Sequence, residues 1–227
     1  MVGLDSMFLE NALQTENQHL RDQLQELLAE ARLNEQKMHR FDQLERCLIG
    51  TRSLAELIQI LLCDFKTAFD HDAVTLTLID PEYEIARILE EEKGGDAKMA
   101  GLVLLESSVV LTNLYGDNLR PFLGTFDAER HSAILDPSSC ECVSVAFLPL
   151  LSQGELIGSL NIGSCKVERF ATGSGTDFLE RLAAIFAICL ENALNHERLK
   201  LMGLTDPLTG VNNRRYFESR CLEEITH

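Results

Sequence analysis

The chain has 227 residues, a hydrophobic content of 45% and a formal net charge of −16. The apolar content is sufficient for a packed core, and the acidic balance argues against general binding to nucleic acids or to anionic lipid surfaces. The sequence contains neither an apolar run long enough to cross a bilayer nor a secretory signal pattern, and its seven scattered cysteines are typical of reduced thiols. We therefore expect a cytoplasmic protein that binds neither nucleic acid nor membrane.

Residues 8–48 contain neither proline nor glycine and predict one long helix. Most side chains on a heptad seam along this helix are apolar: Leu13, Asn17, Leu20, Leu24, Leu27, Ala31, Asn34, Met38 and Phe41. This spacing is typical of a coiled coil, and Asn17 falls at an a position, where a buried asparagine sets register and two-strandedness. The seam predicts a homodimer whose helices run parallel or antiparallel. The alternative is a solitary amphipathic helix packed on its own domain.

Gly50 ends the long helix, and a second helix is predicted over about 53–69. Ser53 and Glu56 have the spacing of a capping box at its start. Residues 73–80 alternate apolar and polar side chains as a strand does, and we expect 85–91 to pair with them as another strand.

The stretch 97–140 contains several glycines and prolines and gives no clear pattern. Residues 142–151 and 155–164 then form two apolar runs joined by a tight turn, which predicts an antiparallel hairpin. The middle of the chain is therefore rich in β-structure.

A last long helix is predicted to begin at Thr176 or Asp177 and to run through 178–202. Up to residue 190 it is apolar nearly all round, so we expect it to be buried against the sheet or a partner. Beyond that point the apolar positions thin to a narrow stripe that is similar to a second coiled-coil seam. The stripe predicts three further dimer-interface residues: Leu190, Leu194 and Leu201.

The span from about 40 to 200 resembles a GAF domain. The likeness is carried by CVSVAFLPLLSQGELIGSLNIGS (142–164), with Pro149 before the turn and Gly158 in the returning strand, and by FLERLAAIFAICLENAL (178–194). More narrowly, NLRPFLGTF (118–126) and RFATGSGTDFLERLA (169–183) are similar to a GAF-like family of uncharacterised bacterial proteins. The resemblance implies an α+β fold, a GAF-like antiparallel sheet with long N-terminal and C-terminal helices, and a role as a sensor.

Residues 204–217, LTDPLTGVNNRRYF, are similar to the opening of GGDEF domains, the diguanylate cyclases that make cyclic di-GMP from two GTP. The matching residues are Asp206, Leu208, Thr209, Asn213, Arg214 and Arg215. The metal-binding aspartate strand and the GG[DE]EF hairpin of that family do not follow, and Gly94-Gly95 lacks the Glu-Phe pair. We therefore expect a truncated GGDEF start with no catalytic residue, and a hinge to the output domain at Asp206, Asn213 and Arg214.

These patterns divide the chain into an N-terminal coiled-coil helix at 1–49, a GAF-like sensor domain at 50–190, a linking helix at 191–203 and a truncated GGDEF start at 204–227. We expect a dimeric sensor that biases the packing of its C-terminal helices and so regulates the cyclase output of a parent protein. A dimerisation scaffold without a ligand is an alternative that the sequence leaves open.

Strand alternation indicates where a small ligand would bind, although the sequence identifies neither a ligand nor a cofactor. One face of the predicted sheet resembles the pocket side of a GAF domain, roofed by 97–140. The predicted ligand-binding residues on that face are Thr75, Thr77, Ser144, Ser159 and Asn161. The opposite, fully apolar face is expected to pack on the long helices. The plainer interpretation is that these small polar residues only lie under a closed lid.

Cysteine chemistry gives a second hypothesis for function. Cys140 and Cys142, with Cys165 near the end of the returning strand, could form a thiol cluster, and some GAF-type proteins reduce free methionine sulfoxide with such thiols. A thiol redox enzyme is thus the alternative, against the plain interpretation of cysteine as a small apolar residue. No metal site is expected, because C-x-C lacks a second ligand pair and His71, between two aspartates, fits a solvated corner better than a metal site.

Overall fold

The computed structural model describes residues 2–93, 99–135, 141–170 and 176–204, with side chains described in 16–92, 99–135, 141–170 and 176–200. The chain divides into two compact units, Met1–Gln43 and Leu44–His227. Helix α1 (Val2–Gly50) continues across this division, so its last two turns belong to the second unit. The long N-terminal helix expected from residues 8–48 is confirmed and extends further at both ends.

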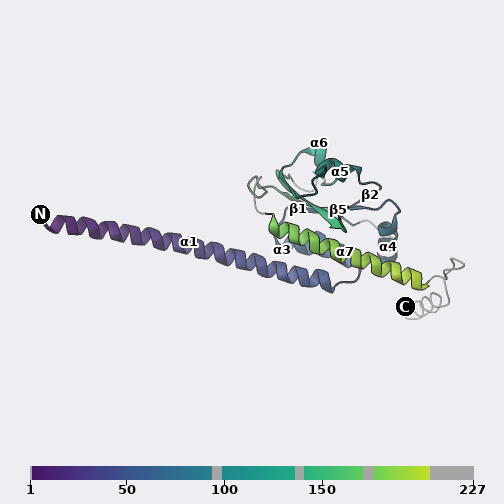
Figure 1. Ribbon diagram of the computed structural model, residues 1–227, viewed down its shortest axis with the longest axis horizontal. Coiled ribbons are helices and arrows are strands. Elements are labelled where there is room, and N and C mark those ends of the chain that lie inside the picture. The colour runs from purple at the N-terminus through teal and green to yellow at the C-terminus, as the bar shows by residue number, and fades with distance from the viewer. Residues whose placement is uncertain (1, 94–98, 136–140, 171–175, 205–227) are drawn as a thin grey trace. The chain divides into compact units, whose positions relative to one another are not determined.

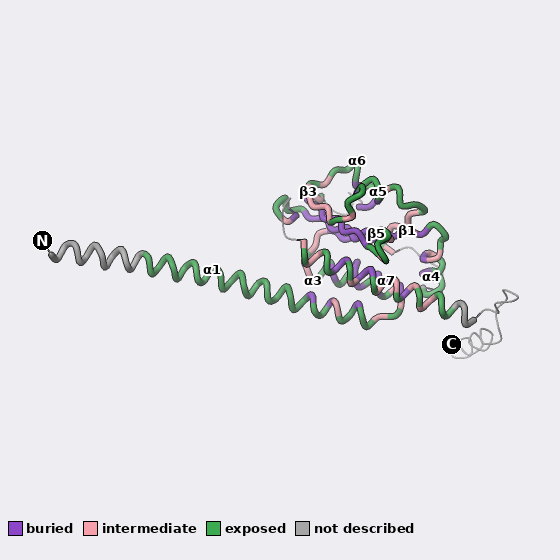
Figure 2. Tube along the Cα trace, in the orientation of Figure 1, coloured by how far each residue is buried: buried purple, intermediate pink, exposed green. Residues whose placement is uncertain are grey.

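The first unit is a single helix in which the described leucines of the apolar seam face solvent, whereas Phe41, the last residue of the seam, is buried. Leu20, Leu24 and Leu27 are 55%, 57% and 64% exposed. Figure 2 shows the described part of this stretch as almost continuously exposed. Asn17 is exposed as well, and the side chain of Leu13 lies outside the described residues.

A five-stranded sheet in the order β2-β1-β5-β4-β3 forms the centre of the second unit. The strands are β1 (Ala73–Ile79), β2 (Leu102–Leu105), β3 (Phe122–Thr125), β4 (Ser144–Ser152) and β5 (Glu155–Ser164). Strand β1 pairs in parallel with β2, and the other neighbours are antiparallel. The expected α+β fold with long N-terminal and C-terminal helices is confirmed, and the sheet is antiparallel except between β1 and β2.

The β4–β5 hairpin follows the sequence prediction. Its turn places Gln153 and Gly154 at φ 52° and 88°, the two positive values that a tight hairpin turn of the primed type needs. In the returning strand, a Cβ added to Gly158 would come within 2.4 Å of the Thr77 carbonyl oxygen. Glycine at this position therefore allows β5 and β1 to approach each other closely.

The second predicted helix is present but is not uniform. It comprises α2 (Leu54–Gln59), a π-helical segment η1 (Ile60–Phe65) and α3 (Lys66–Ala68). Ser53 caps it as expected, because its Oγ accepts a hydrogen bond from the Glu56 backbone N–H at 3.2 Å.

Residues 85–91 form helix α4 (Glu84–Lys93), so their prediction as a strand was wrong. The buried side chains Ile85, Ile88 and Leu89 have helical spacing. The Asp80 carboxylate accepts hydrogen bonds from the backbone N–H groups of Ile85 and Ala86, at 3.1 and 3.0 Å, and so caps the helix. Both edges of β1 are paired with β2 and β5 instead.

Helices cover both faces of the sheet. In Figure 1, α5 (Val109–Tyr115) and α6 (Ala128–His131) lie on one side, and α7 (Asp177–Leu204) runs along the other. The α7 side is apolar as expected, with Leu76, Leu148 and Leu160 fully buried. No helix within the described ranges combines the length and apolarity that crossing a membrane requires.

Candidate functional site

Four of the five predicted ligand-binding residues come together on the sheet face beneath α5 and α6. Asn161 on β5 donates from Nδ2 to the hydroxyl oxygens of Thr75 and Thr77 on β1, at 3.1 and 2.9 Å. Its Oδ1 accepts from the Ser159 hydroxyl at 2.6 Å. None of these four side chains is more than 5% exposed. Strand alternation and register therefore build a buried polar cluster at this position.

Helix α5 and the segment after α6 close this cluster from above. The Tyr115 hydroxyl lies 2.6 Å from Ser159 Oγ and donates to it, because Ser159 already donates to Asn161. Thr75 donates to the Ile134 carbonyl oxygen at 2.6 Å. Burial raises the pKa of Tyr115, so its phenol remains a donor. Sequence analysis missed Tyr115, whose only signal was a tyrosine among apolar residues in the unassigned stretch.

Ser144 does not belong to this cluster, and its assignment to that face was wrong. The register pairs Phe147 with Asn161 and Val145 with Gly163, so Val145 and Phe147 share the face of the polar cluster. Ser144 alternates with them and faces the other way, where its hydroxyl donates to the Lys166 carbonyl oxygen at 2.6 Å. The pairing of β4 with β5 decides which residues of β4 face the polar cluster, and alternation within one strand does not reveal it.

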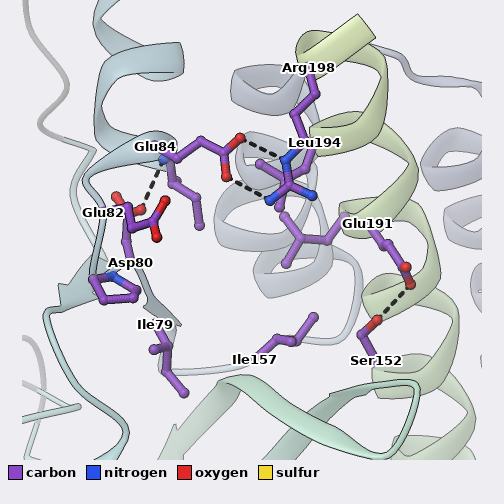
Figure 3. A pocket seen from close by; sticks show the side chains of 12 residues that line it. Ile79, Asp80, Glu82, Glu84, Ser152, Ile157, Glu191, Leu194 and Arg198 are labelled. Atoms are coloured by element: carbon purple, nitrogen blue, oxygen red, sulfur yellow. Dashed lines mark hydrogen bonds and ion pairs between the residues drawn. The ribbon is translucent and has the colours of Figure 1, made fainter.

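A cleft of about 370 Å³ opens elsewhere in the same unit, between α4, the β4–β5 turn and the C-terminal half of α7 (Figure 3). Its apolar lining comes from Ile79, Ile85, Ile157, Leu190 and Leu194. Its polar lining comes from Asp80, Glu82, Glu84, Ser152, Glu191 and Arg198. An apolar floor with a few convergent polar groups is the usual composition of a binding site for a small molecule or a side chain.

Two polar contacts tie α7 to the walls of this cleft. Arg198 donates from Nε and Nη2 to the two carboxylate oxygens of Glu84, both at 2.7 Å, as Figure 3 shows. This bidentate hydrogen bonding lowers the pKa of Glu84 and raises that of Arg198. On the other wall, Glu191 accepts from the Ser152 hydroxyl at 2.7 Å. Helix α7 is thus connected both to α4 and to the hairpin.

A family model described as "Protein of unknown function, DUF484" matches residues 2–194. The chain belongs to the DUF484 family. No curated protein sequence matches it. Two similar solved structures are GAF domains of phosphoenolpyruvate-protein phosphotransferases. The one from Coxiella burnetii has a TM-score of 0.49 and 18% identity, covering 73% of this chain and 96% of that chain. The one from Acinetobacter has a TM-score of 0.49 and 14% identity, covering 71% and 97%.

The Arg169–Phe170 pair, which the sequence singled out for its likeness to a GAF-like family, anchors a corner of this DUF484 chain. Arg169 donates from its guanidinium to the carbonyl oxygens of Phe69 and Asp70, at 2.5 and 2.6 Å. Phe170 is buried, with its ring centroid 6.2 Å from that of His71. The interpretation of His71 as part of a solvated corner was wrong, because aromatic rings surround its imidazole.

The dimer-interface and hinge residues predicted near the C-terminus of the DUF484 chain are either buried, on the cleft wall, or outside the described residues. Leu190 is 1% exposed and is buried in its own unit, and Leu194 lines the cleft. Among the side chains of α7 described up to residue 200, the exposed large apolar ones are Ile188 and Leu199. The remaining predicted residues lie outside the residues or side chains that the structure describes: Leu201, Asp206, Asn213 and Arg214.

Cys142 and Cys165, from the thiol hypothesis, lie just before β4 and just after β5, at the open end of the hairpin. Cys142 is half-buried, is engaged in a disulfide, and has its sulfur against Gly163, where an added Cβ would come within 2.4 Å of it. Cys165 is exposed, and its backbone N–H donates to Asp72 at 2.8 Å. Cys140 lies outside the described residues. Among the described residues, no group of three or more His, Cys, Asp or Glu is arranged to hold a metal.

Proposed function

We propose that this DUF484 chain is a cytosolic, GAF-like signalling module without catalytic activity that passes a change in packing along α7 to the segment after it. The observation that carries the proposal is the Arg198–Glu84 pair at the edge of the cleft, close to the end of α7. Helix α7 runs unbroken for 28 residues from the sheet to Leu204. A shift of the sheet or of α4 would therefore be transmitted to the residues that follow Leu204.

The segment after α7 supports a cyclase as the output. Residues 204–217 resemble the opening of a GGDEF domain, and the chain reaches them directly from α7. A cyclase that joins two GTP needs two such domains facing each other, so the direction in which two α7 helices leave their sheets would control the reaction. Regulation of a GGDEF domain is thus the output that we propose for the parent protein.

The exposed seam of α1 supports a homodimer. Long isolated helices gain little stability from backbone hydrogen bonding alone in water, and most helices in proteins depend on packing of their apolar side. Leu20, Leu24 and Leu27 are spaced as a and d residues of a heptad and are more than half exposed. A second copy of the same seam matches them in spacing and chemistry. Dimerisation through α1 would also bring two output domains together.

The ion pair at the cleft provides the test of signalling. In a protein that joins this chain at residue 204 to a complete cyclase domain, Arg198→Met removes the bond between α7 and Glu84. We expect cyclic di-GMP synthesis to change by at least threefold, because the end of α7 loses its fixed position. The matched control is Arg181→Met, which breaks the pair with Glu45 at 3.0 Å near the start of the same helix.

Amide hydrogen exchange separates a signalling effect from a general loss of stability. Arg198→Met should speed exchange in residues 195–200 while leaving the strands β4 and β5 protected. The proposal fails if cyclase activity is the same in the parent protein, in Arg198→Met and in Arg181→Met, or if all strands lose protection together.

A further inference from the structure

His131 on α6 is a buried imidazole, and one of its nitrogens has no hydrogen-bond partner among the described residues. Its Nδ1 accepts from the Asp127 backbone N–H at 3.0 Å, so this nitrogen carries a lone pair. Burial lowers the pKa of His131, which keeps the ring neutral and leaves the proton on Nε2. His131 is 2% exposed, and no group in the described part of the chain accepts a hydrogen bond from Nε2. The described fold therefore contains a buried N–H donor without a bond that offsets its desolvation.

Aromatic rings surround this donor. The centroid of the imidazole lies 4.8 Å from that of Phe147, 5.7 Å from Phe122 and 5.8 Å from Phe126. Phe147 is the register partner of Asn161, so the imidazole lies beside the buried polar cluster of the sheet. The same packed layer includes Tyr115 from α5. A group that entered here would contact these rings and could accept a hydrogen bond from Nε2.

These surroundings indicate the charge of a group that would accept the hydrogen bond from His131 Nε2. Burying a carboxylate requires a paired cation or several donors, and His131 offers one neutral N–H. A carbonyl oxygen needs only that one donor, and a planar apolar body suits the rings of Phe122, Phe126 and Phe147. The chemistry thus favours an uncharged compound over an acid.

We propose that a small, neutral aromatic carbonyl compound binds beneath α5 and α6, with its oxygen on His131 Nε2 and its ring among the three phenylalanines. This proposal rests on the proposed signalling function, for which the compound would be the effector. Entry requires α5 and α6 to move outward. Helix α5 has only seven residues and no side-chain hydrogen bond at its N-cap, so little holds its start in place. Its movement would break the hydrogen bond between the Tyr115 hydroxyl and Ser159 on the sheet. The present structure is then the closed form of the site.

Benzamide is the probe for this proposal, and toluene is the matched probe without an acceptor. In the full chain labelled with ¹⁵N-histidine, benzamide should shift the His131 Nε2 resonance by much more than toluene does, because only benzamide accepts its hydrogen bond. His131→Phe keeps an aromatic ring but removes the donor. This variant should bind benzamide about tenfold more weakly and toluene about as well as the parent protein does, as the loss of one hydrogen bond predicts. Benzoate should bind more weakly than benzamide.

Three outcomes would overturn the inference. The first is the absence of benzamide binding at millimolar concentration. The second is equal binding of benzamide to the parent protein and to His131→Phe. The third is a His131 Nε2 proton that contacts only a buried water and does not respond to benzamide. If benzamide does not bind, the result of the Arg198→Met test still decides the proposed signalling function. Benzamide binding together with a failed Arg198→Met test would keep the site and remove its link to α7.

Discussion

At the scale of single residues, His131 is buried and His71 is half-buried, and both imidazoles lie among aromatic rings. His71 lies against Phe65, with ring centroids 4.8 Å apart. Burial, and then the charge of Arg169, lower the pKa of His71 from 6.5 to about 3, while Asp72 acts in the opposite direction. The folded chain therefore holds His71 neutral at pH values where the unfolded chain protonates it.

This difference predicts the pH dependence of stability. The pKa is depressed in the folded state, so stability is complete above about pH 6.5 and falls as the pH drops toward 3. Between pH 7 and pH 5 we expect His71 to cost about 2 kcal/mol of unfolding free energy. Urea unfolding of His71→Phe at the two pH values should show a smaller loss by about that amount. The control His39→Gln, on the exposed surface of α1, should lose as much unfolding free energy between pH 7 and pH 5 as the parent protein does. If His71→Phe also loses as much, His71 is not the cause of the pH dependence.

At the scale of elements, α4 stabilises the start of α2 through one carboxylate. Glu92, near the end of α4, accepts hydrogen bonds from the backbone N–H groups of Leu54 and Ala55, at 3.2 and 2.7 Å, and from the Ser53 hydroxyl at 3.0 Å. The free N–H groups at the start of α2 are thus satisfied by a carboxylate that lies 37 to 39 residues further along the chain.

Removing the charge of Glu92 should destabilise this contact. Glu92→Gln keeps the shape but weakens three bonds to one carboxylate, and we expect a loss of about 1 kcal/mol in unfolding free energy by urea titration. Glu90→Gln, on the same helix and exposed, changes the net charge equally and should cost much less. Equal losses in the two variants would show that overall charge, and not the cap, is responsible.

The elements that could be predicted from the sequence are those set by local patterns. The β4–β5 hairpin and the two long helices follow from apolar periodicity and turn residues close together in the chain. Residues 85–91 were assigned to a strand although Ile85, Ile88 and Leu89 have helical spacing and the helix cap, Asp80, is close in the chain. The side of the sheet that Ser144 faces depends on pairing with β5, and the closure of the polar cluster depends on Tyr115. These are long-range contacts that one strand's alternation does not specify.

At the scale of the whole molecule, the proposed homodimer depends on which leucines of α1 lie on the seam. Leu24 is an a residue of the heptad, whereas Leu33 is a c residue, and the two are similarly exposed at 57% and 53%. Leu24→Glu should therefore weaken dimerisation at least tenfold, while Leu33→Glu should leave it within about twofold. Light scattering over a range of concentrations measures both. A monomer at every concentration, or equal effects of the two variants, would rule out this seam.

The order of strands in the sheet also sets the order in which the chain can fold. Strand β1 lies beside β5, with Ala73 opposite Gly163, so the sheet cannot be completed until about ninety further residues have been synthesised. The backbone hydrogen bonds of helix α1 are local, so the helix can form as it leaves the ribosome. If its seam pairs two copies, neighbouring chains made from one messenger RNA would meet through α1 first. Each sheet would then fold in a chain that already has its partner.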